Sequence, residues 1–157
     1  MRLKWNKGGL EMEEAITDRE EILKRTFNKV DRRPGCSFLL QQKTVEYVPE
    51  KSLTVIYPVK EEFLNLAGSM QGGLICAALD NTFGHLCYLI TDKVPIATID
   101  ISTTFHRPIF LGDTLKTVAR VQSKGKTTIH LIGEAFNNED KLIATAVTNY
   151  MILPPSK

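Results

Sequence analysis

The longest apolar stretch of the chain, residues 72–90, predicts a single buried helix. Leucine, isoleucine, alanine and cysteine dominate it, and it contains no proline. A glycine-rich turn at 65–73 leads into it, which is typical of the start of a helix. At about 100° per residue, Asn81, Thr82 and His85 fall on one narrow polar stripe along this helix.

Asp80 lies on the side of the predicted helix opposite the polar stripe. The neighbours on that side are small or apolar, namely Gly73, Cys76, Ala77, Gly84 and Cys87. A carboxylate on such a face loses solvation, which is costly unless another group pairs with it. Asp80 is therefore either the leading functional candidate or a structural residue that backbone or Ser/Thr donors satisfy.

From Ser37 onward the chain outside the helix predicts short strands. Runs rich in β-branched residues cover 37–48, 52–59, 95–106, 113–123, 127–137 and 141–152. Turn signals separate them, including Asn-Asn-Glu-Asp at 137–140. A curved antiparallel sheet of about five to six strands would bury the helix on most sides, which accounts for its narrow polar stripe. The predicted fold class is α+β.

An amphipathic segment at 11–33 predicts an N-terminal helix packed on the sheet. Its apolar residues recur near helical spacing, at Met12, Ile16, Leu23, Phe27 and Val30. Arg-Arg-Pro-Gly at 32–35 ends the segment. A cap over a ligand channel is the alternative role for this helix. Because no repeat or linker interrupts the chain, residues 1–157 are expected to form a single domain.

The composition is that of an ordinary globular protein. Of 157 residues, 43% are hydrophobic and 24% charged; the net charge is only +2, so nucleic-acid binding is not indicated. The three cysteines and three histidines show no metal-ligand spacing, and no metal is expected. A reducing, cytoplasmic location is expected. The charged N-terminus argues against a signal peptide, and the polar residues inside 72–90 argue against a membrane span.

Familiar catalytic motifs do not fit the residues around the helix. Residues 68–72 are not a G-x-S-x-G elbow, because the serine directly follows the first glycine. Asp80 and His85 point about 140° apart on the helix, so they cannot form a local triad with Ser69. No phosphate loop or dinucleotide fingerprint occurs. The remaining chemistry is the start of the helix and one carboxylate.

The N–H groups near Gln71, Gly72 and Gly73 would carry the positive end of the helix dipole. Such groups can polarise a carbonyl and hold an oxyanion, although a plain glycine-rich turn would have the same sequence. Asp80 lies about 12 Å along the axis from Gly72, so the two cannot serve one carbonyl within a chain. Two antiparallel copies of the helix across a two-fold axis would bring them together. This spacing predicts a homodimer.

Two segments resemble the hotdog-fold acyl-CoA thioesterases of the phenylacetate-degradation and 4-hydroxybenzoyl-CoA type. Residues 65–73 read N-x-x-G-x-x-Q-G-G and are followed by Asp80, where the family has N-x-x-G-x-x-H-G-G and then an Asp or Glu. Residues 105–115 read F-H-R-P-x-x-x-G-D-x-L, like the family's strand–turn–strand element. The resemblance covers about 37–153 and implies a hotdog fold, in which a curved antiparallel sheet wraps a long central helix.

The resemblance also implies roles for individual residues in thioester hydrolysis. Gly72 would polarise the thioester carbonyl, and Asp80 of the partner subunit would be the nucleophile or general base. Asn65 would position the water or thioester, and Thr98 falls where relatives carry a Ser or Thr near the carboxylate. Gln71 replaces the usual His; it still forms hydrogen bonds but does not titrate near neutral pH, which favours an orienting role.

The implied substrate is an acyl-CoA, and no cofactor beyond its coenzyme A is expected. Arg107, Lys124 and Lys126 fall at strand ends and turns where family members often hold the nucleotide phosphates. Phe83, Tyr88 and Met70 are candidates for the acyl pocket. A homodimer, paired into a dimer of dimers, is expected without nucleic-acid or membrane partners. The alternatives are a non-catalytic acyl-CoA-binding module and an acyl-thioester hydratase or dehydratase.

Overall fold

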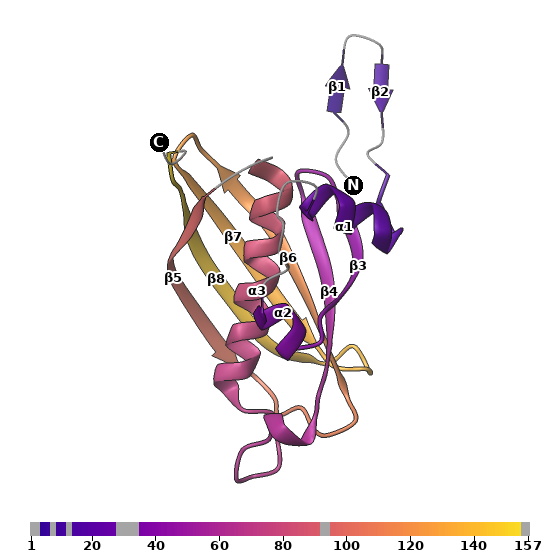
Figure 1. Cartoon of the computed structure of the whole chain (residues 1–157), viewed down its shortest axis with the longest axis vertical. Coiled ribbons are helices and arrows are strands. Elements are labelled where there is room, and N and C mark those ends of the chain that lie inside the picture. Colours follow the sequence, from indigo (N-terminus) through magenta and orange to yellow (C-terminus); the bar gives the residue numbers. More distant parts are fainter. Residues whose placement is uncertain (1–3, 7–8, 12–13, 28–34, 92–94, 155–157) are drawn as a thin grey trace.

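A six-stranded antiparallel sheet packed against one long helix forms the body of the protein in a computed structural model (Figure 1). The structure describes residues 4–6, 9–11, 14–27, 35–91 and 95–154. The strands are β3 (Lys43–Val48), β4 (Ser52–Pro58), β5 (Ile96–Phe105), β6 (Thr114–Lys124), β7 (Thr128–Phe136) and β8 (Leu142–Ile152). Their order is β3-β4-β6-β7-β8-β5, so β3 and β5 are the sheet edges. The predicted α+β hotdog architecture is confirmed.

The long helix α3 (Gly72–Thr91) packs on the sheet at very close range. A methyl group at Gly133 on β7 would lie 2.5 Å from the ring of Phe83 and 3.3 Å from the side chain of Leu79. Only glycine leaves room for this contact, and Phe83 is fully buried. By length and composition α3 could cross a membrane, but 50% of its most hydrophobic window is buried inside the protein. It is the core helix of the fold.

The prediction of a strand over 37–48 is wrong in its first half. The short helix α2 (Gly35–Leu39) occupies that part, and β3 begins only at Lys43. Gln41 lies between them with a φ of 50°, a left-handed conformation typical of the end of a helical turn. The apolar run at 36–40 is too short for its spacing to distinguish a strand from a helix.

The N-terminal helix α1 (Arg19–Phe27) is shorter than the predicted 11–33. Asp18 starts it, because its Oδ1 accepts hydrogen bonds from the N–H groups of Glu20 (2.9 Å) and Glu21 (3.4 Å). The part of the prediction that follows Phe27 lies outside the described residues. A hairpin of β1 (Lys4–Asn6) and β2 (Gly9–Glu11) precedes α1 and extends away from the sheet in Figure 1.

The polar stripe of α3 faces the protein interior, and the small-residue side of α3 is the more open one. Thr82 is 1% exposed, and its Oγ1 lies 2.9 Å from the hydroxyl of Tyr57 and 2.7 Å from that of Thr117. These partners belong to β4 and β6. On the opposite side Ala77 is exposed and Asp80 is half-buried. Thr82 of the narrow stripe therefore makes buried polar contacts with the sheet.

Gln42, just before β3, joins the other two residues of the stripe. Its Oε1 accepts a hydrogen bond from Asn81 Nδ2 (2.6 Å), and its Nε2 lies 3.3 Å from His85 Nδ1. Because an amide nitrogen only donates, Nδ1 is the acceptor and the neutral ring carries its proton on Nε2. The sequence gives no sign of this arrangement, since Gln42 lies 43 residues from His85.

The buried His85 is expected to make stability fall in mild acid. Burial lowers the pKa of His85 from 6.5 to about 4. Below about pH 6.5 the unfolded chain binds a proton at this ring and the folded chain does not, so stability falls between pH 6.5 and 4, by at most about 3 kcal/mol. Urea unfolding at pH 7 and pH 4.5 measures this loss. His85→Gln should reduce it, whereas the exposed-site control His106→Gln should retain the wild-type pH dependence.

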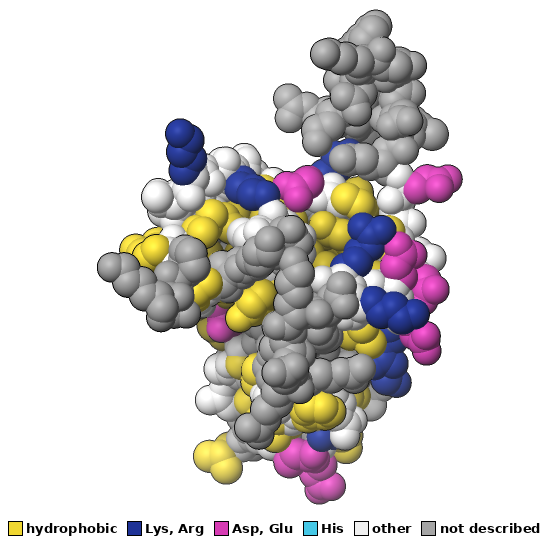
Figure 2. All heavy atoms as spheres, turned by 45° about the horizontal axis from the view of Figure 1, so that its top comes forward, with side chains coloured by type: hydrophobic (Ala, Val, Ile, Leu, Met, Phe, Trp, Pro, Cys, Tyr) yellow, Lys and Arg dark blue, Asp and Glu magenta, His cyan; other side chains and the backbone are white. Residues whose placement is uncertain are grey.

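The surface shown in Figure 2 has no field of one charge sign. Lys and Arg side chains lie there among Asp and Glu side chains, with hydrophobic atoms between them.

The three cysteines, Cys36, Cys76 and Cys87, are free thiols.

Candidate active site

The edge strand β5 runs along the small-residue side of α3. Three contacts mark its course, from Thr98 Oγ1 to Asp80 Oδ1 (3.2 Å), from Thr103 Oγ1 to Cys76 Sγ (3.5 Å), and from the ring of Phe105 to Gly72, where a methyl group would lie 3.1 Å away. The residue numbers of β5 fall as those of α3 rise, so the two elements run antiparallel. The side of α3 that carries the candidate carboxylate therefore lies at the open edge of the sheet.

Two hydroxyl groups hold one oxygen of the Asp80 carboxylate. The hydroxyl of Tyr150 donates to Oδ1 at 2.7 Å, and Thr98 Oγ1 donates to the same atom at 3.2 Å. Oδ2 makes no hydrogen bond within the described part of the chain. The structure thus places Thr98 beside the carboxylate, as the sequence suggested, and orients Asp80 with one oxygen available for chemistry.

Tyr150 is a site residue that the sequence analysis missed. It lies on β8 directly opposite Thr98 of β5 and is 3% exposed. Burial and the adjacent Asp80 carboxylate raise the pKa of Tyr150 above its usual value, so the phenol keeps its proton and acts as a donor near neutral pH. The signal that could have identified Tyr150 is the register between β5 and β8. A bulge between Thr98 and Asp100 makes that register hard to predict from the sequence.

The buried thiol of Cys87 lies on the same side of α3. Burial, with a smaller contribution from Asp80, raises the pKa of Cys87 to about 12. The thiol is therefore protonated near neutral pH and is a poor nucleophile.

The loop before α3 is shaped by the side chains of Asn65 and Gln71. Asn65 Oδ1 accepts hydrogen bonds from the N–H groups of Ala67 (2.9 Å) and Ser69 (3.3 Å), and Gly68 takes a φ of 75°. Gln71 precedes the helix, and its Oε1 accepts a hydrogen bond from the Gly73 N–H. Both side chains therefore make hydrogen bonds within the turn of their own chain.

Gly72 N–H is left available at the start of α3. Gln71 caps the N–H of Gly73, but the N–H of Gly72 makes no hydrogen bond within the described residues. The helix dipole adds positive potential at this point. The group can therefore donate to a carbonyl oxygen that approaches past Phe105, whose side chain is half-exposed.

Within one chain the Gly72 N–H and the Asp80 carboxylate lie on the same side of α3 but at different heights. Eight residues of helix separate them by about 12 Å along the axis. The structure therefore presents both groups along one open edge but does not bring them to one point.

The three residues predicted to bind coenzyme A do not lie together in one chain. Arg107 Nη1 donates to the carbonyl oxygen of Leu142 at 2.9 Å. Lys124 Nζ pairs with Glu50 at 3.0 Å and donates to the carbonyl of Ile90, near the end of α3. Lys126 is exposed and has no partner among the described residues. One chain does not gather the three cations into a single phosphate site.

Two of the acyl-pocket candidates are core residues. Phe83 is 0% and Met70 3% exposed, whereas Tyr88 is 40% exposed and remains accessible. The described residues contain no group of three or more His, Cys, Asp or Glu that could hold a metal ion.

The sequence is similar to proteins named as esterases and thioesterases. It is 30% identical to a candidate esterase of Saccharolobus solfataricus over 142 residues, which cover 90% of this chain and 95% of that protein. It is 33% identical to human acyl-coenzyme A thioesterase 13 over 70 residues, which cover 44% of this chain and 49% of the human protein.

Solved structures share the fold. The E. coli PaaI protein from the phenylacetic acid degradation operon has a TM-score of 0.76 at 21% identity, covering 87% of this chain and 97% of that chain. A Streptococcus mutans protein bound to acetyl-CoA has a TM-score of 0.70 at 21% identity, covering 82% and 98%. A family model described as the thioesterase superfamily matches residues 67–144. The chain belongs to the thioesterase superfamily.

Proposed function

We propose that the protein hydrolyses an acyl-CoA thioester to a carboxylic acid and coenzyme A. The observation that carries the proposal is the Asp80 carboxylate, which Tyr150 and Thr98 hold by one oxygen at the open edge of the sheet. Human acyl-coenzyme A thioesterase 13 and the acetyl-CoA-bound Streptococcus mutans protein support coenzyme A as the substrate's carrier. Three free cysteines support a cytoplasmic location.

The proposed reaction combines the start of α3 with a carboxylate from a second chain. Gly72 N–H donates to the thioester oxygen and stabilises the negative charge that develops on it. Asp80 of the partner subunit either attacks the carbonyl carbon or takes a proton from the water that attacks it. The carbon–sulfur bond then breaks, and the thiolate leaves with the electron pair and takes up the proton that water loses. Where Asp80 is the nucleophile, this leaves an acyl–Asp80 anhydride, which water hydrolyses to the carboxylic acid and the free carboxylate. A thiolate is a good leaving group, so no metal or organic cofactor is required.

The exposed edge of β5 supports the required dimer. This ten-residue strand exposes 51% of Ile99 and 51% of Phe105, and long apolar edges are normally covered. A second β5 can pair antiparallel to the first across a two-fold axis that lies midway between Thr98 and Phe105. Thr98 of each chain then lies opposite Phe105 of the other chain. Because Thr98 contacts Asp80 and Phe105 adjoins Gly72, this register brings Asp80 of the partner subunit to Gly72. Two such dimers would form the proposed tetramer.

A panel of acyl-CoA substrates tests the function. Acetyl-, hexanoyl-, phenylacetyl- and benzoyl-CoA are incubated with the purified protein, and released thiol is measured with a thiol-reactive dye. Steady thiol release from at least one of them supports hydrolysis and reports the preferred acyl group. Binding by calorimetry without thiol release would instead indicate an acyl-CoA-binding module. Hydration of crotonyl-CoA without thiol release would indicate a hydratase.

Tyr150→Phe is expected to lower kcat about tenfold or more and to leave KM nearly unchanged. The variant removes a hydrogen bond to a charged group, and such bonds are worth about 1.5–3 kcal/mol. Tyr150 positions the carboxylate and need not touch substrate, so its effect should depend on Asp80. Steady-state kinetics of Tyr150→Phe, Asp80→Asn and the double variant check this. If the two losses multiply in the double variant, Tyr150 does not act through Asp80.

A further inference from the structure

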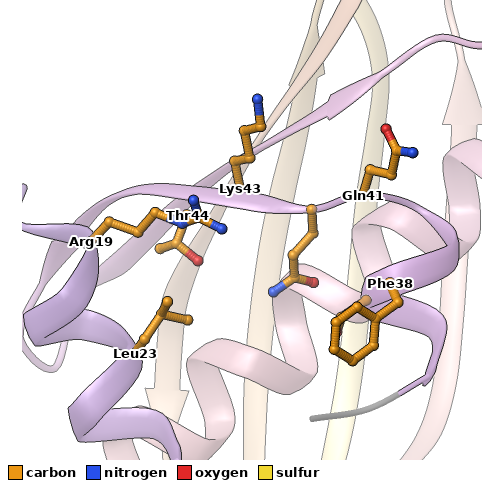
Figure 3. A pocket seen from close by; sticks show the side chains of 8 residues that line it. Arg19, Leu23, Phe38, Gln41, Lys43 and Thr44 are labelled. Carbon is orange, nitrogen blue, oxygen red and sulfur yellow. The ribbon is translucent and has the colours of Figure 1, made fainter.

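A second site lies at the other edge of the sheet, in a hollow of about 300 Å³ between α1, α2 and the start of β3 (Figure 3). Its lining side chains are Arg19, Leu23, Ser37, Phe38, Gln41, Gln42, Lys43 and Thr44. The sheet order separates β3 from β5 by five strand spacings, or about 24 Å along the sheet. The hollow is therefore separate from the proposed catalytic edge.

Thr44 gives the hollow a buried hydroxyl that the chain does not satisfy. The residue is 5% exposed, and its Oγ1 is buried without a hydrogen-bond partner. Buried polar groups in folded proteins nearly always have partners, so this hydroxyl is left to pair with a water molecule or a bound ligand. Gln42, whose amide also lines the hollow, is by contrast held by Asn81 and His85.

An unpaired cation, Arg19, gives the hollow positive charge, because its side chain makes no ion pair or hydrogen bond within the described part of the chain. Lys43 is also a lining residue, but in Figure 3 its side chain extends away from the other lining side chains. None of the lining residues is acidic. In the view of Figure 3 the Arg19 side chain points toward Thr44, and both residues line the hollow. A guanidinium and a hydroxyl that line one hollow suit an oxyanion, because the planar N–H groups of the guanidinium match a carboxylate.

The apolar side chains that line the hollow favour an organic acid over a simple inorganic anion as the ligand. Leu23 and Phe38 both line the hollow, and the Phe38 side chain is 62% exposed. The volume lies at the low end for small-molecule sites, which suits a compact ligand. We propose that this hollow binds a small organic carboxylate, with its anionic end at Arg19 and Thr44 and its apolar body against Leu23 and Phe38.

Calorimetric titration of the full chain with sodium hexanoate and sodium benzoate tests the site. Binding with a dissociation constant of about 1 mM or below is expected, with amide shifts at Thr44 in ¹H–¹⁵N spectra. Hexanamide and inorganic phosphate are the comparison probes. Each should bind at least about tenfold more weakly, because one lacks the charge and the other lacks the apolar body.

Three variants separate this site from any carboxylate bound at the catalytic edge. Arg19→Gln and Thr44→Val should each weaken hexanoate binding about tenfold, whereas Lys24→Gln, a charge removed elsewhere on α1, should leave it unchanged. Thr44→Val should also melt at a higher temperature than the wild type without ligand, because it removes an unsatisfied hydroxyl.

Three outcomes would overturn the proposal. They are equal hexanoate binding by all variants, phosphate binding as tight as hexanoate binding, and no carboxylate binding at all. Carboxylate binding is measured without thioester hydrolysis. If either the binding site or the proposed hydrolysis is disproved, the other can still be tested.

Discussion

Replacing Asp80 with asparagine is expected to lower kcat for thioester hydrolysis by about 10²- to 10⁴-fold. Asparagine keeps nearly the same shape and still accepts the hydrogen bonds from Tyr150 and Thr98, but it is neither a nucleophile nor a base. KM should change little, since the carboxylate acts on the reacting carbon or water rather than on the bulk of the substrate. Thiol release under saturating substrate measures the loss.

Asp140→Asn is the matched control for this substitution. Asp140 lies in the exposed β7–β8 turn with a φ of 56°, a conformation that asparagine tolerates equally well. Its ion pair with Lys116 is at the surface and contributes little. Activity close to the wild type is expected for this control. If Asp80→Asn also retains activity while remaining folded, Asp80 is not the catalytic group.

The second large effect is expected from removing the N–H group of Gly72 without removing the helix. Gly72 is the first residue of α3, a position where proline fits well because the N–H is not needed for the helix. Gly72→Pro lacks the donor, and loss of one oxyanion donor typically lowers kcat by about 10²- to 10³-fold. Gly72→Ala retains the donor and tests the added carbon alone.

The alanine control matters because Gly72 lies against Phe105. An added carbon would lie 3.1 Å from the end of the Phe105 ring, but this side chain is 51% exposed and can turn away. Gly72→Ala is therefore expected to lose only a few-fold in kcat, about 1 kcal/mol or less. Equal losses in the two variants would mean that space at Gly72, rather than its N–H, is what activity requires.

Co-expression of Asp80→Asn with Gly72→Pro tests whether the site is shared between chains. Half of the randomly formed dimers are hybrids, and each hybrid has one intact site out of two. About a quarter of the wild-type activity should therefore return. No recovery would mean that each site is built within a single chain.

The fold could be predicted because its elements are long and regular. The strands from β5 to β8 are nine to eleven residues long and separated by clear turns, and α3 is one unbroken apolar run. The error at 37–42 arose where the apolar run was too short to show a period. The catalytic candidates Gly72 and Asp80 came from their spacing and a family resemblance, which need no tertiary contacts.

The contacts that complete the site could not be predicted, because they join distant segments. Tyr150 reaches Asp80 across 70 residues, and its pairing with Thr98 lies next to a bulge in the neighbouring strand. Likewise, helical spacing identifies the two sides of α3 but does not say which one the sheet covers. Gln42, Tyr57 and Thr117 decide that question, and each lies far from α3 in sequence.

The contact between Phe83 and Gly133 has a consequence for how this protein can diversify. Asp80 is less than one helical turn from Phe83. The close packing of Phe83 against Gly133 on β7 therefore also fixes the position of the carboxylate along the sheet. Substitutions that slide or rotate α3 would misplace the proposed catalytic group. New acyl preferences should therefore arise through substitutions in the loop 65–71 and along β5, while the packing of α3 against β7 stays constant.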